Sequence, residues 1–263
     1  MRCQMKAGVS TACLYPMQTE EALETLAKMG IKTLEIFFNA PSELSKPFLR
    51  NLREIKEAYD CQVISVHPFL SGYEPFLFFT DYERRFHDGI EMYRPIFSAA
   101  AFLGASYVVF HGNYRDSGFE NARYFERYYR LYEAGKKIGV CLCQENVERC
   151  KSATPDFIKD MSRALGKDAK FVLDVKQAIR AKIDPLEMAK AMGSGLSHIH
   201  ISDSTAEYDC LPIGMGNVDF SELIKILHGF DYHGALILEL YRHNFQKTTD
   251  LYESYMNLNN LLP

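Results

Sequence analysis

The feature that most constrains the fold is a regular alternation of short apolar runs, rich in β-branched residues, with longer segments of helical periodicity. Eight such runs are predicted as strands, at residues 7–10, 33–37, 63–67, 107–111, 140–145, 170–174, 197–202 and 235–240. When helices alternate with strands in this way, the strands are parallel. Eight repeats predict one (β/α)8 TIM barrel domain over residues 1–263; an open doubly wound sheet is the alternative.

The segments between the runs carry the start and stop signals of helices. Thr19, followed by two glutamates, begins one predicted helix, and Gly30 ends it. Pro47 begins the next predicted helix, and Gly104 ends the one after that. The longest irregular stretches, residues 68–82 and 202–219, both follow predicted strands, so both are expected at the carboxyl end of the barrel.

Composition and charge narrow the class of protein further. Hydrophobic residues make up 47% and charged residues 24% of the chain, which is typical of a globular protein. The net charge of -4 and the lack of a long Lys/Arg run argue against a nucleic-acid-binding surface. Arg2, Gln4 and Lys6 interrupt any apolar stretch at the N-terminus, and residues 95–110 are too short and mixed for a membrane span.

The chain has seven cysteines, among them Cys3, and no CxxC motif. This pattern favours reduced thiols and a cytoplasmic protein.

Polar side chains gather at the carboxyl ends of the predicted strands. In chain order they are Glu35, His67, His111, Glu145, Asp174, His200 and Glu239. Barrels of this class build their active sites at that end. Several carboxylates buried together would repel one another and lose their hydration, and a bound cation removes both costs. The sequence therefore predicts one divalent metal ion, held by Glu145, Asp174, His200 and Glu239.

The donor set also restricts the metal. Oxygen-rich ligation with a single imidazole suits Mn(II), Mg(II) or Co(II), and Zn(II) is compatible with it. His67 and His111 stand at the same rim. They have three interpretations: donors to the metal ligands, contacts to the substrate, or ligands of a second ion.

Strand alternation assigns the neighbours of the predicted ligands to faces, because residues two apart on a strand share a face. Cys141 and Cys143 share the face of Glu145 and are interpreted as small residues of the barrel interior. His198 shares the face of His200 and is interpreted as structural.

Three further segments have two interpretations each. Gly214 and Gly216 indicate a flexible turn, or a loop that closes over a substrate. The aromatic residues of segment 68–82 either pack over the barrel mouth or form the wall of a substrate pocket. Those of segment 119–132 recur at helical spacing, which favours core packing or a contact in a homo-oligomer.

The order and strand placement of several short motifs resemble the xylose isomerase-like barrel family. The motifs are Ser65-Val66-His67, Phe110-His111-Gly112, Gln144-Glu145-Asn146, Leu173-Asp174, His198 to Asp203, Gly214-Met215-Gly216 and Leu238-Glu239. That family includes sugar and sugar-phosphate isomerases and epimerases, hydroxypyruvate isomerase, inosose dehydratase and endonuclease IV. The resemblance spans essentially the whole chain.

The resemblance implies a role in carbohydrate metabolism, as an isomerase or epimerase of a small keto sugar, polyol or sugar phosphate. In the epimerase branch the four residues that match the predicted ligands bind one divalent metal, manganese for example. Glu145 and Glu239 would also move protons through an enediolate. The residues expected to contact the carbohydrate substrate are His67, His111, Gln177 and Glu35.

The sequence departs from the family pattern at two places. The family often has Asp-x-x-His after the sixth strand, and here Gln177 takes the place of that histidine. Tyr208, Asp209 and Cys210 replace the Asp-x-His pair that endonuclease IV uses for a third metal. An inosose dehydratase-like lyase, an endonuclease IV-like metal hydrolase and a ligand-binding barrel without turnover remain the alternatives.

Overall fold

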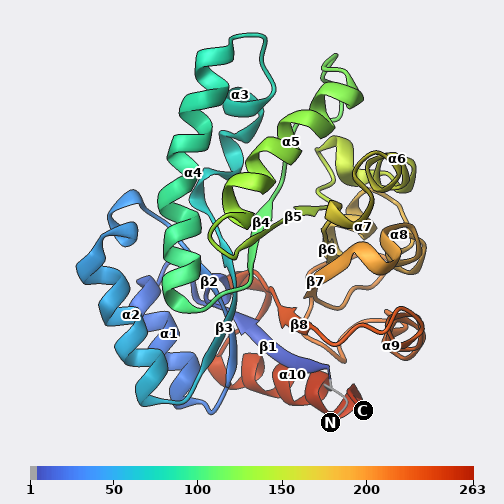
Figure 1. Ribbon diagram of the computed structural model, residues 1–263. Coiled ribbons are helices and arrows are strands. Elements are labelled where there is room, and N and C mark those ends of the chain that lie inside the picture. Colours follow the sequence, from blue (N-terminus) through green and yellow to red (C-terminus); the bar gives the residue numbers. More distant parts are fainter. Residues whose placement is uncertain (1–4) are drawn as a thin grey trace.

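The computed structural model describes residues 5–263, and within this range eight parallel strands close into one barrel with helices on its outside (Figure 1). Each strand pairs with the next along the chain, and β8 pairs with β1 to complete the ring. The predicted (β/α)8 TIM barrel is therefore confirmed, and the open sheet is wrong.

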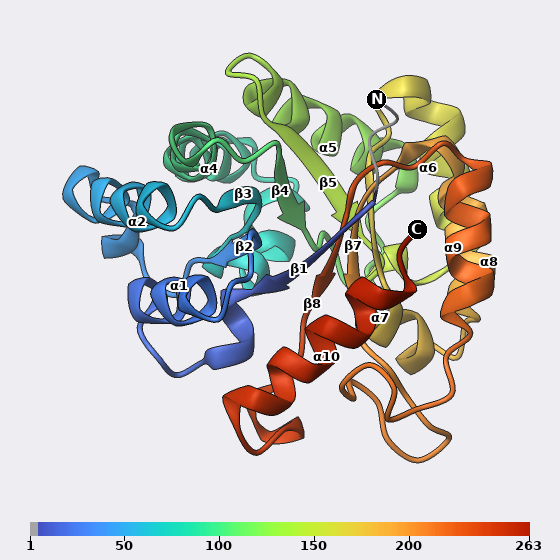
Figure 2. The same cartoon turned by 90° about the horizontal axis from the view of Figure 1, so that it is seen from below.

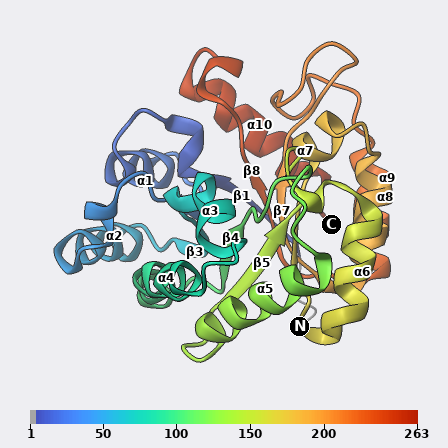
Figure 3. The ribbon, with the colours of Figure 1, turned by 90° about the horizontal axis from the view of Figure 1, so that it is seen from above.

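The strands are β1 (Lys6–Ser10), β2 (Thr33–Phe37), β3 (Gln62–His67), β4 (Tyr107–Phe110), β5 (Cys141–Glu145), β6 (Phe171–Asp174), β7 (Leu196–Ile201) and β8 (Ala235–Leu238). The helices are α1 (Thr19–Lys28), α2 (Lys46–Ala58), α3 (Glu74–Phe78), α4 (Glu83–Leu103), α5 (Asn121–Lys136), α6 (Pro155–Leu165), α7 (Val175–Arg180), α8 (Pro185–Met192), α9 (Phe220–Gly229) and α10 (Thr248–Leu261). The long helices surround the strands when the barrel is seen from below (Figure 2). Seen from above, α3, α7 and the loop that follows β7 lie over the carboxyl ends of the strands (Figure 3).

Strand ends at the barrel mouth differ from the predicted ones by one or two residues. β4 ends at Phe110 and β8 at Leu238, so His111 and Glu239 follow their strands. The physical reason is visible at β4, where a side chain replaces the neighbouring strand as the hydrogen-bond acceptor of the backbone. The Glu74 carboxylate accepts hydrogen bonds from the backbone N–H groups of His111, at 2.8 Å, and Gly112, at 2.6 Å.

The barrel interior contains the small and branched side chains that strand alternation predicts. Val109, Cys143 and Val172 form a buried cluster of their own, with Tyr107 and Cys141 packed against it. The interpretation of both cysteines as interior residues is confirmed. The six cysteines of the described range are free thiols, whereas Cys3 lies outside that range, as do Arg2 and Gln4.

The two aromatic segments divide between core and surface. In α5 the side chains of Tyr124, Phe125, Tyr128 and Tyr132 are buried, so core packing accounts for most of this segment. The segment after β3 is not irregular, because it contains α3 and a short 3-10 helix, Phe69–Gly72. Of its aromatic residues, Phe78 and Phe79 are buried and Phe69 is half-buried, whereas Tyr73, Phe76 and Tyr82 are exposed.

The helices of residues 5–263 include none that is both long enough and apolar enough to span a membrane.

Gly8 in β1 tests how tightly the barrel wall is packed. A Cβ atom added there would lie 2.5 Å from Ile237 Cδ1 and 2.6 Å from the carbonyl oxygen of Thr33. Because the carbonyl belongs to the backbone, it cannot rotate away. We expect Gly8→Ala to lower the free energy of unfolding by about 1–3 kcal/mol, the usual cost of overpacking a core. Urea unfolding measures this change.

The control is Gly118→Ala, since no described atom lies within 4 Å of a Cβ added at Gly118. Equal unfolding free energies for the two variants would show that the wall around Gly8 is not tightly packed.

Candidate metal centre

Four side chains from neighbouring strands converge at the carboxyl end of the barrel. Glu145 and Asp174 end β5 and β6, His200 is the fifth residue of β7, and Glu239 directly follows β8. One potential ligand atom from each of the four lies within 4.8 Å of the others. The structure thus brings together the four residues that the sequence predicts as metal ligands.

Glu145 points into the mouth because the side chains of the residues before and after it form hydrogen bonds with the neighbouring strand ends. The Gln144 amide donates to the carbonyl oxygens of Phe110, at 3.2 Å, and His111, at 2.9 Å. The Asn146 side chain accepts from the backbone N–H of Asp174, at 2.7 Å, and donates to its carbonyl oxygen, at 2.9 Å. The motif Gln-Glu-Asn therefore fixes three adjacent strand ends around the central carboxylate.

The two carboxylate oxygens of Asp174 have different roles. It is the N-cap residue of α7, and its Oδ1 accepts from the backbone N–H of Gln177 at 3.0 Å. Its buried Oδ2 accepts no well-aligned hydrogen bond from residues 5–263, although the Lys176 ammonium lies 3.3 Å away. Capping fixes the rotation of the carboxylate, which leaves Oδ2 free for a ligand.

His200 is held between carboxylates on both of its ring nitrogens. Its Nε2 lies 2.9 Å from Glu35 Oε2, while its Nδ1 lies 3.0 Å from Glu145 Oε1 and 3.8 Å from Glu239 Oε2. Burial opposes a charge on this ring, but the three carboxylates raise its pKa well above the usual value. A carboxylate behind a histidine is the usual support of an imidazole ligand, so Nδ1 is the atom that faces the centre.

Glu35 lies one layer below the centre and does not face the mouth. It has no exposed surface, and its Oε2 is within hydrogen-bond distance of Ser65 Oγ, at 2.7 Å, and His198 Nε2, at 3.1 Å. The sequence predicted a contact between Glu35 and the substrate. The structure instead places it where it orients His200, because the tilt of the strands sets the depth of each side chain. His198 is buried beside it, which fits the structural role expected of that histidine.

His67 and His111 form a second cluster that shares Glu145 with the first. His111 Nε2 lies 3.0 Å from His67 Nε2 and 2.7 Å from Glu145 Oε2, and ligand atoms of all three residues lie within 4.8 Å of one another. His67 Nδ1 is 3.3 Å from the carbonyl oxygen of Pro68, which favours a proton on Nδ1 and leaves Nε2 as a lone-pair donor. Both histidines therefore border the centre.

Burial and charge set the ionisation of the carboxylates in the centre. Burial raises the pKa of Asp174 to about 6, the nearby Lys176 opposes this, and Glu145 and Glu239 add to it. Burial alone would also raise the pKa of Glu145, but the adjacent imidazoles lower it well below its usual range. Burial and the neighbouring His111 lower the pKa of His67 to about 4, so this ring is neutral at pH 7.

Lys176 is a residue of the centre that the sequence analysis did not single out. Its Nζ lies 2.7 Å from Glu239 Oε2 and 3.3 Å from Asp174 Oδ2, and the residue is 3% exposed. The available signal was its position, a lysine two residues after a predicted ligand. Gln177, expected to contact the substrate, is half-buried, and its side-chain carbonyl accepts from the backbone N–H of Glu148 at 3.0 Å.

The residues present fit a divalent ion. In the part of the chain that the structure describes, the buried oxygens Glu145 Oε2 and Asp174 Oδ2 accept no well-aligned hydrogen bond. Their nearest cationic or imidazole groups are His111 Nε2, 2.7 Å from Glu145 Oε2, and the Lys176 ammonium, 3.3 Å from Asp174 Oδ2. Buried carboxylate oxygens that accept no hydrogen bond are costly, and a divalent cation would satisfy both. These side chains could hold a metal, and their donor chemistry is that of an oxygen-rich site.

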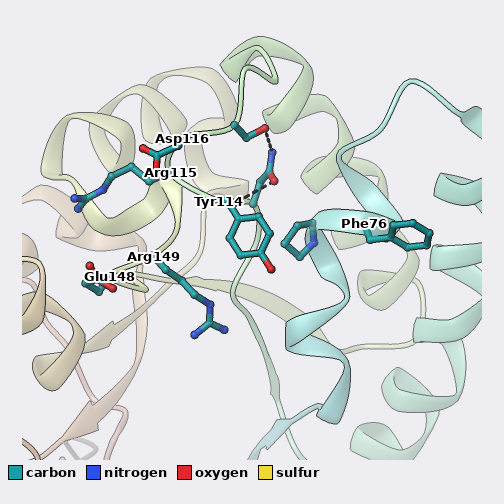
Figure 4. A pocket seen from close by; sticks show the side chains of 9 residues that line it. Phe76, Tyr114, Arg115, Asp116, Glu148 and Arg149 are labelled. Carbon is teal, nitrogen blue, oxygen red and sulfur yellow. Dashed lines mark hydrogen bonds between the residues drawn. The ribbon is translucent and has the colours of Figure 1, made fainter.

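A pocket of about 880 Å³ opens beside the centre between the loops that follow β4 and β5 (Figure 4). Arg149 and Tyr114 point into the same space, whereas Arg115 points away from it. Arg149 Nη2 lies 3.4 Å from His111 Nδ1, so the guanidinium stands next to the second cluster. The pocket offers room and a positive charge to a small molecule at the rim.

The loop after β7 is fixed by one carboxylate. Asp203 accepts hydrogen bonds at 2.9–3.1 Å from the backbone N–H groups of Ser204, Gly214, Gly216 and Val218. A Cβ atom at Gly216 would lie 2.4 Å from Asp203 Oδ1, so only glycine fits there. The backbone of this segment is therefore anchored at four points, which argues against the interpretation as a flexible turn.

A closed barrel of eight parallel strands, with acidic and imidazole side chains gathered at its carboxyl end, defines the class of protein. The chain belongs to the xylose isomerase-like TIM barrel family, whose sequence model matches residues 23–260. The resemblance seen in the sequence motifs is thereby confirmed.

Individual relatives support the same placement. An uncharacterized protein of Mycobacterium leprae is 26% identical over an alignment that covers 95% of this chain and 94% of that protein. The crystal structure of a D-tagatose 3-epimerase-like protein superposes with a TM-score of 0.78 at 22% identity, over 97% of this chain and 98% of the other. D-psicose 3-epimerase from Clostridium cellulolyticum H10 gives a TM-score of 0.78 at 16% identity, over 98% of both chains. At these identities the two structures show the fold alone.

The anchoring role of Asp203 is testable without any substrate. Asp203→Ala removes four hydrogen bonds from backbone N–H groups to one carboxylate. Each such bond contributes about 1.5–3 kcal/mol when its acceptor is charged, so the loop should open by local unfolding. Hydrogen–deuterium exchange at residues 204–218 measures it, and we expect at least about tenfold faster exchange there.

Asp160→Ala removes a carboxylate from the exposed face of α6 and is the control. Unchanged exchange at residues 204–218 in the Asp203 variant would contradict the anchoring role.

Proposed function

We propose that this chain is a divalent-metal-dependent isomerase or epimerase of a small keto sugar, polyol or sugar phosphate. The observation that carries the proposal is the convergence of Glu145, Asp174, His200 and Glu239 within 4.8 Å. Two of these, Glu145 and Glu239, reach the same imidazole nitrogen, at 3.0 and 3.8 Å. A pair of carboxylates beside one bound substrate can take a proton from a carbon atom and return a proton to that carbon or to its neighbour. Family membership and the epimerases among the similar structures support it.

The four ligands would hold Mn(II), Mg(II), Co(II) or Zn(II) through carboxylate oxygens and His200 Nδ1. When bound, the ion supplies Lewis-acid polarisation of a substrate carbonyl. Glu239 is the most open of the four, with its side chain 13% exposed against 2% for Glu145. We therefore assign to Glu239 the exchange of a proton with the substrate carbon on the open side.

Glu145 is the second proton carrier in this proposal. Its Oε1 faces His200 and its Oε2 faces His111 at 2.7 Å, so it is held rigidly and cannot rotate away from the substrate. His67 and His111 line the same rim and are assigned to the substrate oxygens. Arg149, unlike them, carries a permanent charge beside the rim and suits an anionic end of the substrate, such as a phosphate.

The same centre could serve other reactions, and the products separate them. A lyase would release water from a polyol, whereas an isomerase conserves the formula of its substrate. The nuclease alternative needs a third metal, but Asp209 is held by Arg180 through contacts of 2.6 and 2.9 Å. In residues 5–263 none of the three candidate ligand clusters includes Asp209. A barrel that only binds its ligand would not depend on Glu145 or Glu239 for any exchange of protons.

Glu145→Gln tests the proton transfer. We expect the purified protein to contain about one divalent ion per chain and to exchange a substrate C–H for deuterium in D₂O, followed by NMR on a panel of keto sugars. The variant should lose about 10²–10⁴-fold of that exchange rate, the usual contribution of a general base. Glu239→Gln should behave in the same way.

Glu54→Gln, on the exposed face of α2, is the matched control and should exchange at the wild-type rate. Full exchange by Glu145→Gln would refute its role as a proton carrier. Three tightly bound zinc ions per chain would instead support the alternative function, an endonuclease IV-like metal hydrolase.

The pH dependence of metal binding follows from the ionisation of the ligands. Asp174, whose pKa burial raises to about 6, must lose its proton before it binds a cation. His200, whose pKa the neighbouring carboxylates raise well above its usual value, must also free its Nδ1. Protons therefore compete with the ion, and affinity rises with pH. We expect a slope of about two in a plot of log affinity against pH below pH 6, and of about one above it.

Calorimetric titration with Mn(II) between pH 5 and pH 8 measures the slope. Asp174→Asn should bind more weakly at every pH and lose the steeper lower limb. An affinity that does not change between pH 5 and pH 7 would contradict the assignment of both ligands.

A further inference from the structure

The buried Lys176 lies among the candidate metal ligands themselves. Its ammonium is 2.7 Å from Glu239 Oε2 and 3.3 Å from Asp174 Oδ2, so it faces two of the four carboxylate and imidazole ligands. Only 3% of the residue is exposed, and solvent therefore screens these contacts little. The positive charge is a permanent part of the centre.

The chain delivers this side chain through a short helix. Asp174 caps α7, and Lys176 is the second residue of that helix, two residues after the capping ligand. The ring of Tyr241 lies 5.0 Å from the ammonium, within the range of a cation–π contact. Burial opposes the charge, but Asp174 and Glu239 raise the pKa of Lys176 well above its usual value.

The Lys176 ammonium and a divalent ion would therefore both contact the carboxylates of Asp174 and Glu239. An ammonium at these distances neutralises them partly, and it repels a second cation placed a few ångströms away. Its removal would leave Asp174 and Glu239 with His200, whose Nδ1 lies 3.8 Å from Glu239 Oε2, as their remaining positive neighbour. A divalent ion would then meet a more negative site.

We infer that Lys176 is a positioning residue that acts as a resident counter-cation of the metal centre. It holds Asp174 and Glu239 in place before a divalent ion binds, and it weakens the binding of that ion. The inference rests on the proposed metal-dependent function. It assigns the strength of metal binding to a residue that is not itself a ligand.

Lys176→Met tests the inference, because methionine keeps the length of the side chain and removes its charge. Titration with Mn(II) at pH 7.5, followed by EPR of the free ion, gives Kd for both proteins. We expect the variant to bind at least about tenfold more tightly, since a like charge has been removed at short range. Without metal the variant should have a lower Tm than the wild type, and Mn(II) should raise that Tm by more.

The direction of the change distinguishes this role from a merely structural one. A lysine that only supports the fold would leave a disordered site when removed, and Mn(II) would bind more weakly. Lys190→Met removes the same charge from an exposed position of α8 and should leave Kd unchanged. Lys176→Gln keeps a hydrogen-bond donor without the charge, and it should also bind Mn(II) more tightly.

Each result separates the inference from the proposed function. Weaker Mn(II) binding by both Lys176 variants, with normal binding by the wild type, would overturn the inference alone. Binding by the variants but not by the wild type would support the inference and remove the metal from the proposed function. Variants that fail to fold even with Mn(II) would show that Lys176 is part of the core, which would also overturn the inference.

Discussion

The burial of several carboxylates at one end of the barrel is the constraint on which the rest of the site depends. Glu35, Glu145, Asp174 and Glu239 all lie in or just below the mouth, where water does not solvate them well. Each therefore needs a positive or hydrogen-bonding partner. His200 serves both Glu35 and Glu145, and Lys176 serves Glu239. The partners are shared, so that moving one side chain disturbs several others.

Side chains that bind the backbone keep this cluster rigid. Gln144 and Asn146 tie β5 to the ends of β4 and β6, Glu74 holds the first residues after β4, and Asp203 holds the loop after β7. These contacts occur where the strands end and regular pairing stops. A centre supported in this way is organised before any ligand arrives, which is what precise positioning of reacting groups requires.

The sequence was sufficient to predict the barrel and the convergence of the four candidate ligands, because both follow from the alternation of elements and from strand parity. Parity could not place Glu35 correctly. It gives the face of a strand but not the depth, and depth depends on the tilt of the strands around the closed barrel. Lys176 was missed for a related reason, since the direction of its side chain depends on where α7 begins. That start is set by Asp174, a residue considered only as a ligand.

The departure from the family pattern after β6 takes on a different meaning in the structure. Gln177 stands where the resemblance leads one to expect a histidine, which suggests that a polar contact has been lost. The structure shows Gln177 bound to the backbone of Glu148, while Lys176 beside it reaches Asp174 and Glu239. The same helical turn therefore still supplies a polar group to the centre, but it is a charged one aimed at the ligands. In this chain, the first turn of α7 therefore contributes a positive charge to the centre through Lys176.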